Sequence, residues 1–136
     1  MNTAQRILAY RPDVVGLSVY IFNAEETKAL IACLLTLMPE VRIILGGPEV
    51  TYHPQPWLEL GVEAVVCGEG ETVFWDYLQG KSSPSIHTLQ EASSEIARID
   101  LGLLETLESP YFLELDDADM DKRYLYMETA RGCPYE

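Results

Sequence analysis

The sequence has few basic residues, with 9 Lys and Arg against 22 Asp and Glu, so its formal net charge is -13 at pH 7. This charge opposes binding to nucleic-acid phosphates and to anionic membrane surfaces. The chain also lacks a long apolar run: no stretch approaches the ~18 residues of a membrane span, and the N-terminus has a helical pattern where a signal peptide has an apolar block. We therefore predict no nucleic-acid partner, no membrane association and a cytoplasmic location.

Cysteine and histidine are scarce as well. The three cysteines, Cys33, Cys67 and Cys133, are widely scattered, and an odd count in such positions does not suggest a disulfide framework. Cys33 and Cys67 lie in apolar patterns typical of a protein core. His53 and His87 are the only histidines.

The apolar residues gather in short runs, and the 136 residues are enough for one domain with a single core. The clearest run covers residues 41–45 and stops at Gly46-Gly47-Pro48. Similar runs cover 14–20 and 64–67, and the second of these ends in Gly68-Glu69-Gly70. Continuous apolar runs bounded by breakers are typical of buried parallel strands. The sequence therefore predicts an α/β fold with at least three parallel strands.

Helical spacing fills much of the sequence around these runs. Asn23 begins a capping-box-like pattern, and Pro39 closes the helix that it starts. We also expect a short first helix capped by Thr3, and an amphipathic helix over residues 73–78. Residues 48–56 are expected to form a loop.

The regular pattern is lost after residue 80. Residues 81–110 are predicted to be a linker, because Ser-Ser-Pro-Ser and further turn residues interrupt them. The runs 111–115 and 124–129 are strand-like and predict a β-hairpin. We therefore divide the chain into an α/β domain over 1–80, the linker, and a hairpin that begins a further domain over 111–136.

An acidic run in the predicted hairpin resembles a calcium-binding loop. Asp117, Asp119, Asp121 and Glu128 have the spacing of positions 1, 3, 5 and 12 of an EF-hand. Position 6 of that loop is normally glycine for a sharp turn, whereas this chain has Lys122. Flanking helical patterns are also lacking, so we favour a solvated hairpin loop over a calcium site.

The glycines after the predicted strands indicate where a ligand would bind. Parallel, adjacent strands place their carboxyl ends at one edge, and ligands bind there in open α/β sheets. Glycines at that edge leave the backbone open to a ligand, although the same residues are explained equally well as simple turns. A phosphorylation-receiver domain shares the fold class, but it needs an acidic cluster after its first strand, which this sequence lacks.

Four motifs taken together resemble a known family. In order, they are DVVGLS (13–18), LGGPE (45–49), VCGEGE (66–71) and RGCPY (131–135). They look like the front half of a cobalamin-dependent radical SAM protein, in which an N-terminal vitamin B12-binding domain of flavodoxin-like fold precedes a radical SAM barrel. The resemblance implies an incomplete flavodoxin-like (Rossmann-like) sheet and cobalamin as a cofactor.

The resemblance also implies which residues bind the cofactor. Ser18 matches the serine of a Ser-x-Leu element and Gly46-Gly47 match paired glycines, which approach the nucleotide tail of cobalamin; Tyr20 stands where that element has leucine. Glu69 and Glu71 are expected to cap the following helix, and no residue is assigned as catalytic. The implied cofactor-binding residues are Ser18, Val19, Tyr20, Gly46, Gly47, Pro48, Glu49, Gly68, Glu69 and Gly70.

Two family features are missing from this sequence. The first two strands have no counterpart, and neither does the Asp-x-His-x-x-Gly motif that carries a cobalt ligand. His53 is either a cobalt ligand or an exposed loop histidine, and we favour the second. Cys133 matches the first cysteine of a C-x3-C-x2-C motif that holds an iron-sulfur cluster together with S-adenosylmethionine, but the chain ends at Glu136.

The resemblance therefore implies a cobalamin-binding fragment of a radical SAM enzyme, of the Fe-S oxidoreductase or methyltransferase type, that is not catalytic by itself. Its partner would be its own missing radical SAM domain. The rival hypothesis is a degenerate α/β scaffold that binds no cofactor and serves as an interaction module. Because the absent strands leave the 14–20 strand without a neighbour, we also predict self-association through that edge, or a hairpin folded over it.

Overall fold

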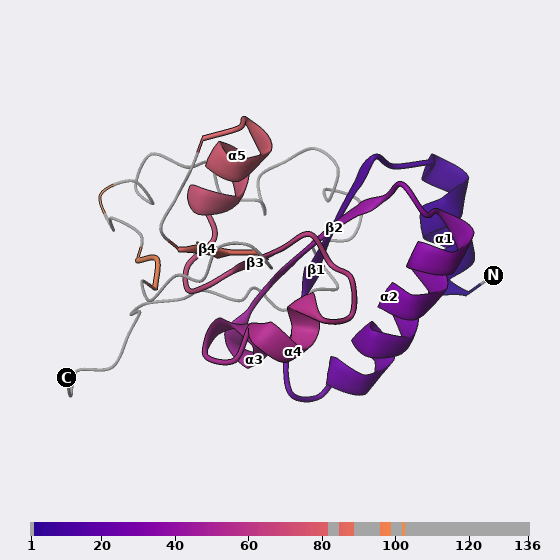
Figure 1. Cartoon of the computed structure of the whole chain (residues 1–136), viewed down its shortest axis with the longest axis horizontal. Helices are drawn as coiled ribbons and strands as arrows, with labels where there is room; N and C mark the ends of the chain where they lie inside the picture. Colours follow the sequence, from indigo (N-terminus) through magenta and orange to yellow (C-terminus); the bar gives the residue numbers. More distant parts are fainter. Residues whose placement is uncertain (1, 82–84, 89–95, 99–101, 103–136) are drawn as a thin grey trace, which may run out of the picture. The chain divides into compact units, whose positions relative to one another are not determined.

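The structure is a computed structural model in which residues 2–81, 85–88, 96–98 and 102 are described. The chain divides into two compact units, Met1–Ile99 and Asp100–Glu136. The elements of the first unit, in chain order, are α1 (Thr3–Tyr10), β1 (Val14–Ser18), α2 (Ala24–Leu37), β2 (Arg42–Gly46), α3 (Pro48–Thr51), α4 (Gln55–Leu58), β3 (Ala64–Val66), α5 (Val73–Leu78) and β4 (Ile86–His87) (Figure 1).

The strands form one sheet in the order β1-β2-β3-β4. β1 and β2 pair in parallel, with Val15 opposite Ile43 and Ser18 opposite Gly46. β2 and β3 are also parallel, whereas β4 runs antiparallel to β3. The predicted α/β class with three parallel strands is therefore confirmed, and the flavodoxin-like assignment is consistent with it.

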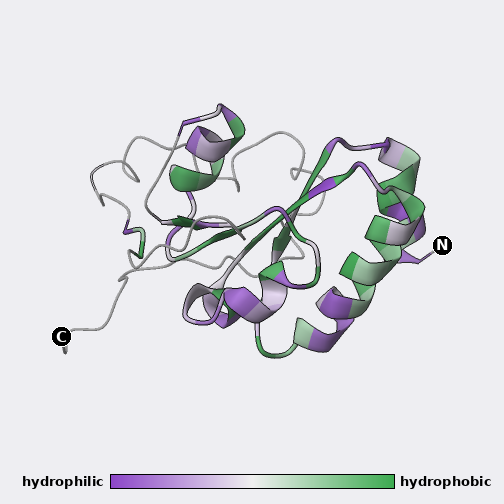
Figure 2. Ribbon diagram, in the orientation of Figure 1, coloured by the Kyte–Doolittle hydropathy of each residue, from purple (hydrophilic) through white to green (hydrophobic). Residues whose placement is uncertain are grey.

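The helices cover the two faces of the sheet. Val15, Ile43, Leu45 and Val65 belong to one apolar cluster, in which the strands pack against α1, α2, α3 and α4. Ile44, Ala64 and Val66 belong to a second cluster, which α5 covers. In Figure 1, α5 accordingly lies on the opposite side of the strands from α3 and α4, and Figure 2 shows the strands largely in the hydrophobic colours. This burial on both faces explains why the strands read as continuous apolar runs.

The first two helices begin close to the predicted positions, but their caps differ. Asn2 caps α1, and its side chain forms a reciprocal capping box with Gln5, so the prediction of Thr3 as the cap was wrong. Thr3 is instead the first helical residue. Asn23 stands at the N-cap of α2, as predicted, but its side chain makes no capping hydrogen bond. That side chain turns back toward the end of β1 instead.

The prediction of a loop over residues 48–56 was also wrong. The segment contains α3 and begins α4, which are each a single turn long. Pro48 occupies the first helical position, where its fixed φ suits a helix and its missing N–H leaves no bond unmade. Val50 and Trp57 are buried against the sheet. Packing of these side chains, rather than intrinsic helix propensity, therefore stabilises the two short helices.

The region after residue 80 adds to the sheet although its sequence shows no strong pattern. β4 pairs with β3, Cys67 N–H donates to Ser85 O at 2.9 Å, and Ala97 forms an isolated parallel bridge with Gly68. The division into 1–80, 81–110 and 111–136 remains a prediction. The predicted hairpin, its calcium-loop-like acids and Cys133 lie outside the described residues.

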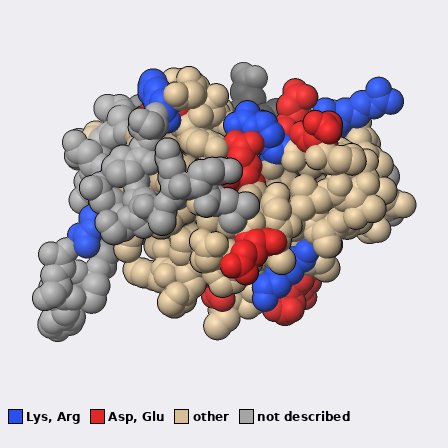
Figure 3. Space-filling view, in the orientation of Figure 1, with Lys and Arg blue, Asp and Glu red and all other residues tan. Residues whose placement is uncertain are grey.

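The charged side chains on the described surface are dispersed. Figure 3 shows acidic and basic groups interspersed on the visible face, with uncharged residues covering most of the described area between them. Within the described residues, no helix is long and apolar enough to cross a membrane.

Candidate functional site

The carboxyl ends of β1 and β2 lie side by side at one end of the sheet. We call this end, with Ser18, Gly46-Gly47 and the turn at Gly68, the ligand edge. Ser18 lies opposite Gly46 in the register, and its side chain is exposed. Val19 continues the contact beyond β1, because its N–H donates to Gly46 O at 2.8 Å and its carbonyl accepts from Glu49 N–H at 3.3 Å. The start of α3 is thereby fixed against the end of β1, and the exposed Ser18 hydroxyl stands beside bare glycine backbone.

Gly46 and Gly47 differ in the space around them. Gly47 has φ +108, and a Cβ there would stand 2.6 Å from Val19 O, so only glycine fits this turn. A Cβ at Gly46 would meet nothing closer than the Val66 Cβ at 4.0 Å. The protein therefore leaves Gly46 open without needing that space for its own packing.

The turn after β3 is also packed closely against neighbouring backbone. Gly68 has φ +93, and a Cβ there would collide with the carbonyl oxygen of Ala97. Ala97 N–H donates to Cys67 O at 2.8 Å, and Glu69 N–H donates to Ala97 O at 2.9 Å. The short segment around Ala97 therefore borders the ligand edge, although the sequence predicted only a linker there.

Thr51 links the turn after β2 to the turn after β3. Its hydroxyl donates to Gly47 O at 2.9 Å and accepts from Gly68 N–H at 3.1 Å. Thr51 is 8% exposed, so these bonds are partly shielded from water. Sequence reasoning missed this residue because it fell in an expected loop. Pro48 followed by Glu49 is a helix-start pattern that could have revealed α3, but nothing in the sequence pairs Thr51 with Gly68.

The loop between β1 and α2 is held by Asn23 and carries exposed apolar residues. The Asn23 side chain accepts from Tyr20 N–H at 2.8 Å and donates to Ser18 O at 3.1 Å. Tyr20 and Phe22 stack with their ring centroids 5.3 Å apart. Ile21 and Phe22 are 85% and 77% exposed, respectively. Exposed apolar side chains gathered in this way are typical of surfaces that bind a ligand or a partner.

A polar cluster of Arg42, Glu63 and Tyr77 lies at the amino end of β2 and β3, away from the ligand edge. The Arg42 guanidinium bonds both Glu63 oxygens, at 2.6 and 2.7 Å, and the Tyr77 hydroxyl donates to Glu63 at 2.8 Å. The hydrogen bond from Arg42 holds the pKa of Glu63 below its usual range. Burial, followed by the bond to Glu63, raises the pKa of Tyr77 to about 12. The cluster ties α5 to the sheet.

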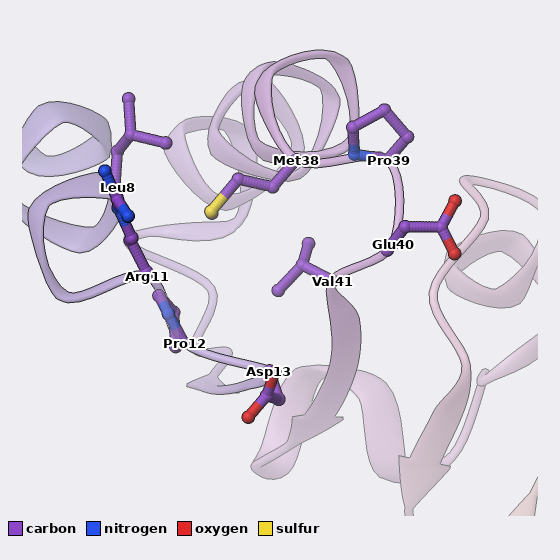
Figure 4. A pocket seen from close by; sticks show the side chains of 8 residues that line it. All are labelled: Leu8, Arg11, Pro12, Asp13, Met38, Pro39, Glu40 and Val41. Atoms are coloured by element: carbon purple, nitrogen blue, oxygen red, sulfur yellow. The ribbon is translucent and has the colours of Figure 1, made fainter.

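A surface pocket of about 280 Å³ also lies at the amino end of the sheet. Figure 4 shows that it is formed by the two connections that lead into β1 and β2. Its lining residues are Leu8, Arg11, Pro12, Asp13, Met38, Pro39, Glu40 and Val41. None of the residues predicted to bind a cofactor is among them. Since ligands of open α/β sheets bind at the carboxyl end, this pocket is not the predicted site.

The described residues offer no metal centre. Among them, no group of three or more His, Cys, Asp or Glu side chains could hold a metal ion. His53 is exposed in the connection between α3 and α4. Burial lowers the pKa of His87 and raises the pKa of the Cys67 thiol to about 11. Cys67 is 1% exposed, so it lies in the core as predicted, whereas Cys33 is only partly buried and lies outside the described core clusters.

The residues predicted to bind the cofactor fall at the carboxyl ends of β1 and β2 and in the segments that directly follow β1, β2 and β3. The contacts of Val19 and Thr51 join these segments directly. Gly70 lies two residues after Gly68, and a Cβ there would meet only Val66 Cγ1 at 3.5 Å. Their roles toward a cofactor remain a prediction.

Comparison with known proteins identifies this architecture. The family of B12 binding domains matches residues 2–78. The chain belongs to this family. The match covers all three turns and the helices that pack beside them, so the ligand edge lies within the B12-binding domain.

Two curated relatives match nearly the whole chain. The cobalamin-dependent radical SAM methyltransferase TokK of Streptomyces tokunonensis is 29% identical over 143 residues, which cover 91% of this chain and 21% of TokK. The uncharacterized methyltransferase PH0819 of Pyrococcus horikoshii is 24% identical over 148 residues, or 98% of this chain and 32% of that protein. The chain thus spans a third or less of the length of these relatives.

A solved structure has the same fold. The crystal structure of the N-terminal domain of the hypothetical protein TM0182 of Thermotoga maritima superposes with a TM-score of 0.52 at 25% sequence identity. The superposition covers 61% of this chain and 69% of that domain. It supports the fold class.

The chemistry of the ligand edge fits the nucleotide tail of cobalamin. The tail carries a flat heterocycle with a ring nitrogen, which can accept a hydrogen bond from a hydroxyl such as that of Ser18. Gly46 presents backbone without a side chain and without a close neighbour, which suits a flat group. A donor and open backbone therefore stand together where the family match places a B12 domain.

Proposed function

We propose that this chain binds cobalamin at the carboxyl edge of its sheet. The observation that supports this most strongly is the pairing of the exposed Ser18 with the open backbone of Gly46, inside a B12-binding domain. Ser18 donates a hydrogen bond to the nucleotide tail, and Gly46-Gly47 let the heterocycle approach the backbone. The turn at Gly68-Glu69-Gly70 closes the far side of the site.

Bound cobalamin supplies a cobalt centre that can carry a methyl group. The residues of this chain hold and orient that cofactor and perform no bond-making step themselves. Tyr20 and Phe22, which stack beside the edge, shield the cofactor from water. His53 is left as an exposed loop residue, so the proposal includes no histidine ligand to cobalt.

The proposal is tested by adding a methyl group to the ligand edge. Gly46→Ala causes no steric conflict within the protein, because its Cβ meets nothing nearer than 4.0 Å. It should nevertheless raise the dissociation constant for hydroxocobalamin about tenfold, measured by absorbance titration. Gly16→Ala is the matched control: it lies in β1, away from the edge, where its Cβ makes an ordinary 3.4 Å contact with Phe74. Equal affinities of the two variants would contradict the proposed site.

The whole protein is further proposed to be a radical SAM enzyme, supported by the similarity to TokK. In the proposed enzyme Cys133 would be the first ligand of an iron-sulfur cluster, which together with S-adenosylmethionine would supply the radical chemistry. The 136-residue chain is then not catalytic alone. In a longer protein that continues past Glu136, Cys133→Ser should abolish the absorbance of the reconstituted cluster, whereas Cys33→Ser should retain it. A cluster that survives Cys133→Ser would overturn this assignment.

The sheet also suggests a partner, which is a second copy of this chain. Among the described residues, β1 pairs only with β2, and an edge strand of this kind can pair with a further strand. We propose that this edge pairs with another copy of the chain, or with the remainder of a longer protein. Light scattering of the 136-residue chain should show a dimer or larger species; a monomer at high concentration would contradict self-association.

A further inference from the structure

Thr51 occupies the place where the pairing of β2 and β3 stops. The parallel ladder joins Ile44 to Ala64 and Leu45 to Val65, and it ends before the glycine turns. Beyond that point the Thr51 hydroxyl spans the gap, since it donates to Gly47 O at 2.9 Å and accepts from Gly68 N–H at 3.1 Å. One side chain therefore joins two turns that ladder hydrogen bonds do not connect.

An ordinary helical role does not account for both bonds. Threonine in a helix often donates to the carbonyl four residues earlier, and this explains the bond to Gly47. The bond from Gly68 N–H joins residues 17 positions apart in the chain, and it uses the acceptor side of the same hydroxyl. Gly47 and Gly68 both have positive φ and little room, so neither turn can shift freely to replace this contact.

We propose that Thr51 is a positioning residue of the ligand edge, which fixes the turn after β2 relative to the turn after β3 so that both meet the nucleotide tail of cobalamin. This inference rests on the proposed function. Thr51 acts through the backbone of Gly47 and Gly68 and does not itself contact the reacting atoms. Loss of its hydroxyl leaves the Gly68 N–H partly buried without an acceptor and releases the two turns from each other.

The test compares Thr51→Val with Thr51→Ser. Valine keeps the shape of threonine but removes the hydroxyl, whereas serine keeps the hydroxyl. Thr51→Val should raise the dissociation constant for hydroxocobalamin about tenfold, and Thr51→Ser should stay within about twofold of the wild type. Glu63→Gln is the control for general destabilisation, because it breaks a side-chain hydrogen-bond cluster at the opposite end of the sheet. Affinities are measured at a temperature where circular dichroism shows every variant to be folded.

A second ligand separates a positioning role from a merely structural one. Cobinamide retains the corrin ring but lacks the nucleotide tail, so its affinity should be the same for Thr51→Val and for the wild type. Unchanged hydroxocobalamin affinity in Thr51→Val, or an equal loss for both ligands, would overturn the inference while the proposed function stands. If the wild type itself does not bind hydroxocobalamin, the proposed function fails and the positioning role fails with it.

Discussion

Ser18 lies directly opposite Gly46 in the parallel pairing of β1 and β2, and the next residue, Val19, bonds back to the Gly46 carbonyl at 2.8 Å. The end of the first strand is thereby fixed to the beginning of a turn that has no side chains. A hydroxyl donor and open backbone are held side by side by main-chain hydrogen bonds. Such preorganisation would lower the cost of binding the proposed ligand.

The crowding around Gly47 predicts a large loss of stability on substitution. Gly47→Ala combines a positive φ with a Cβ 2.6 Å from Val19 O, so it should lower the free energy of unfolding by about 3 kcal/mol or more. Gly80→Ala is the matched control. It has φ +78 but nothing within 4 Å of its Cβ, and it should cost only about 1 kcal/mol. Chemical denaturation measures both, and equal losses would show that the contact with Val19 does not matter.

We expect the contribution of Glu63 to the stability of the fold to be lost in acid. Because the Arg42 guanidinium lowers the pKa of Glu63 in the folded state, the pair stabilises the protein above the unfolded pKa of the carboxyl. This contribution is lost as the pH falls through the folded pKa. At neutral pH, Glu63→Gln should cost about 1 kcal/mol, since solvent partly screens the pair.

The difference in unfolding free energy between wild type and Glu63→Gln is measured by urea denaturation from pH 7 to pH 3. It should shrink toward the acid end of this series. A difference that stays constant over the whole range would rule out a contribution from the ionised carboxylate.

We expect the contribution of Tyr77 to stability to be lost in base rather than in acid. Its pKa is raised from 10.0 to about 12, chiefly by burial, so the protonated phenol stabilises the folded state below pH 10 and this contribution is lost as the pH rises toward 12. Tyr77→Phe does not titrate at this position, and the other tyrosines titrate in both proteins. The stability advantage of the wild type over Tyr77→Phe should therefore fall between pH 10 and pH 12. An advantage that persists unchanged would contradict the buried, hydrogen-bonded phenol.

Cys67 should be inert while the protein is folded. The thiol is 1% exposed, and burial raises its pKa to about 11, so it is protonated and inaccessible at pH 8. In the double variant Cys33→Ser, Cys133→Ser, Cys67 is the only thiol. A disulfide reagent should leave it unmodified in native buffer and modify it fully in guanidinium chloride. Rapid modification of the native protein would show that the chain directly after β3 is not buried.

The sequence predicted the parts of this fold that depend on local burial pattern. β1, β2 and β3 appeared as continuous apolar runs because both of their faces are covered, and α2 was long enough for helical periodicity to show. The glycine turn after β2 was also predictable. Gly46 ends a strand whose direction the crossover fixes, and Gly47 adopts the positive φ that glycine favours.

The parts that sequence reasoning missed depend on contacts between distant residues. α3 is a single turn that contains two β-branched residues, Val50 and Thr51, and only burial against the sheet explains it. β4 is two residues long, so no periodicity could reveal it. The partnership of Thr51 with Gly68 spans two strands, and it becomes visible only when the turns after them are placed together.

The central claim is that the edge formed by Ser18, Gly46 and Gly68 binds cobalamin, and an absorbance titration of the purified chain with hydroxocobalamin tests it most directly. Binding at this edge predicts a saturable spectral shift at one cofactor per chain, which Gly46→Ala weakens and Gly16→Ala leaves unchanged. A flat response across the titration would contradict the claim and favour a scaffold that binds no cofactor.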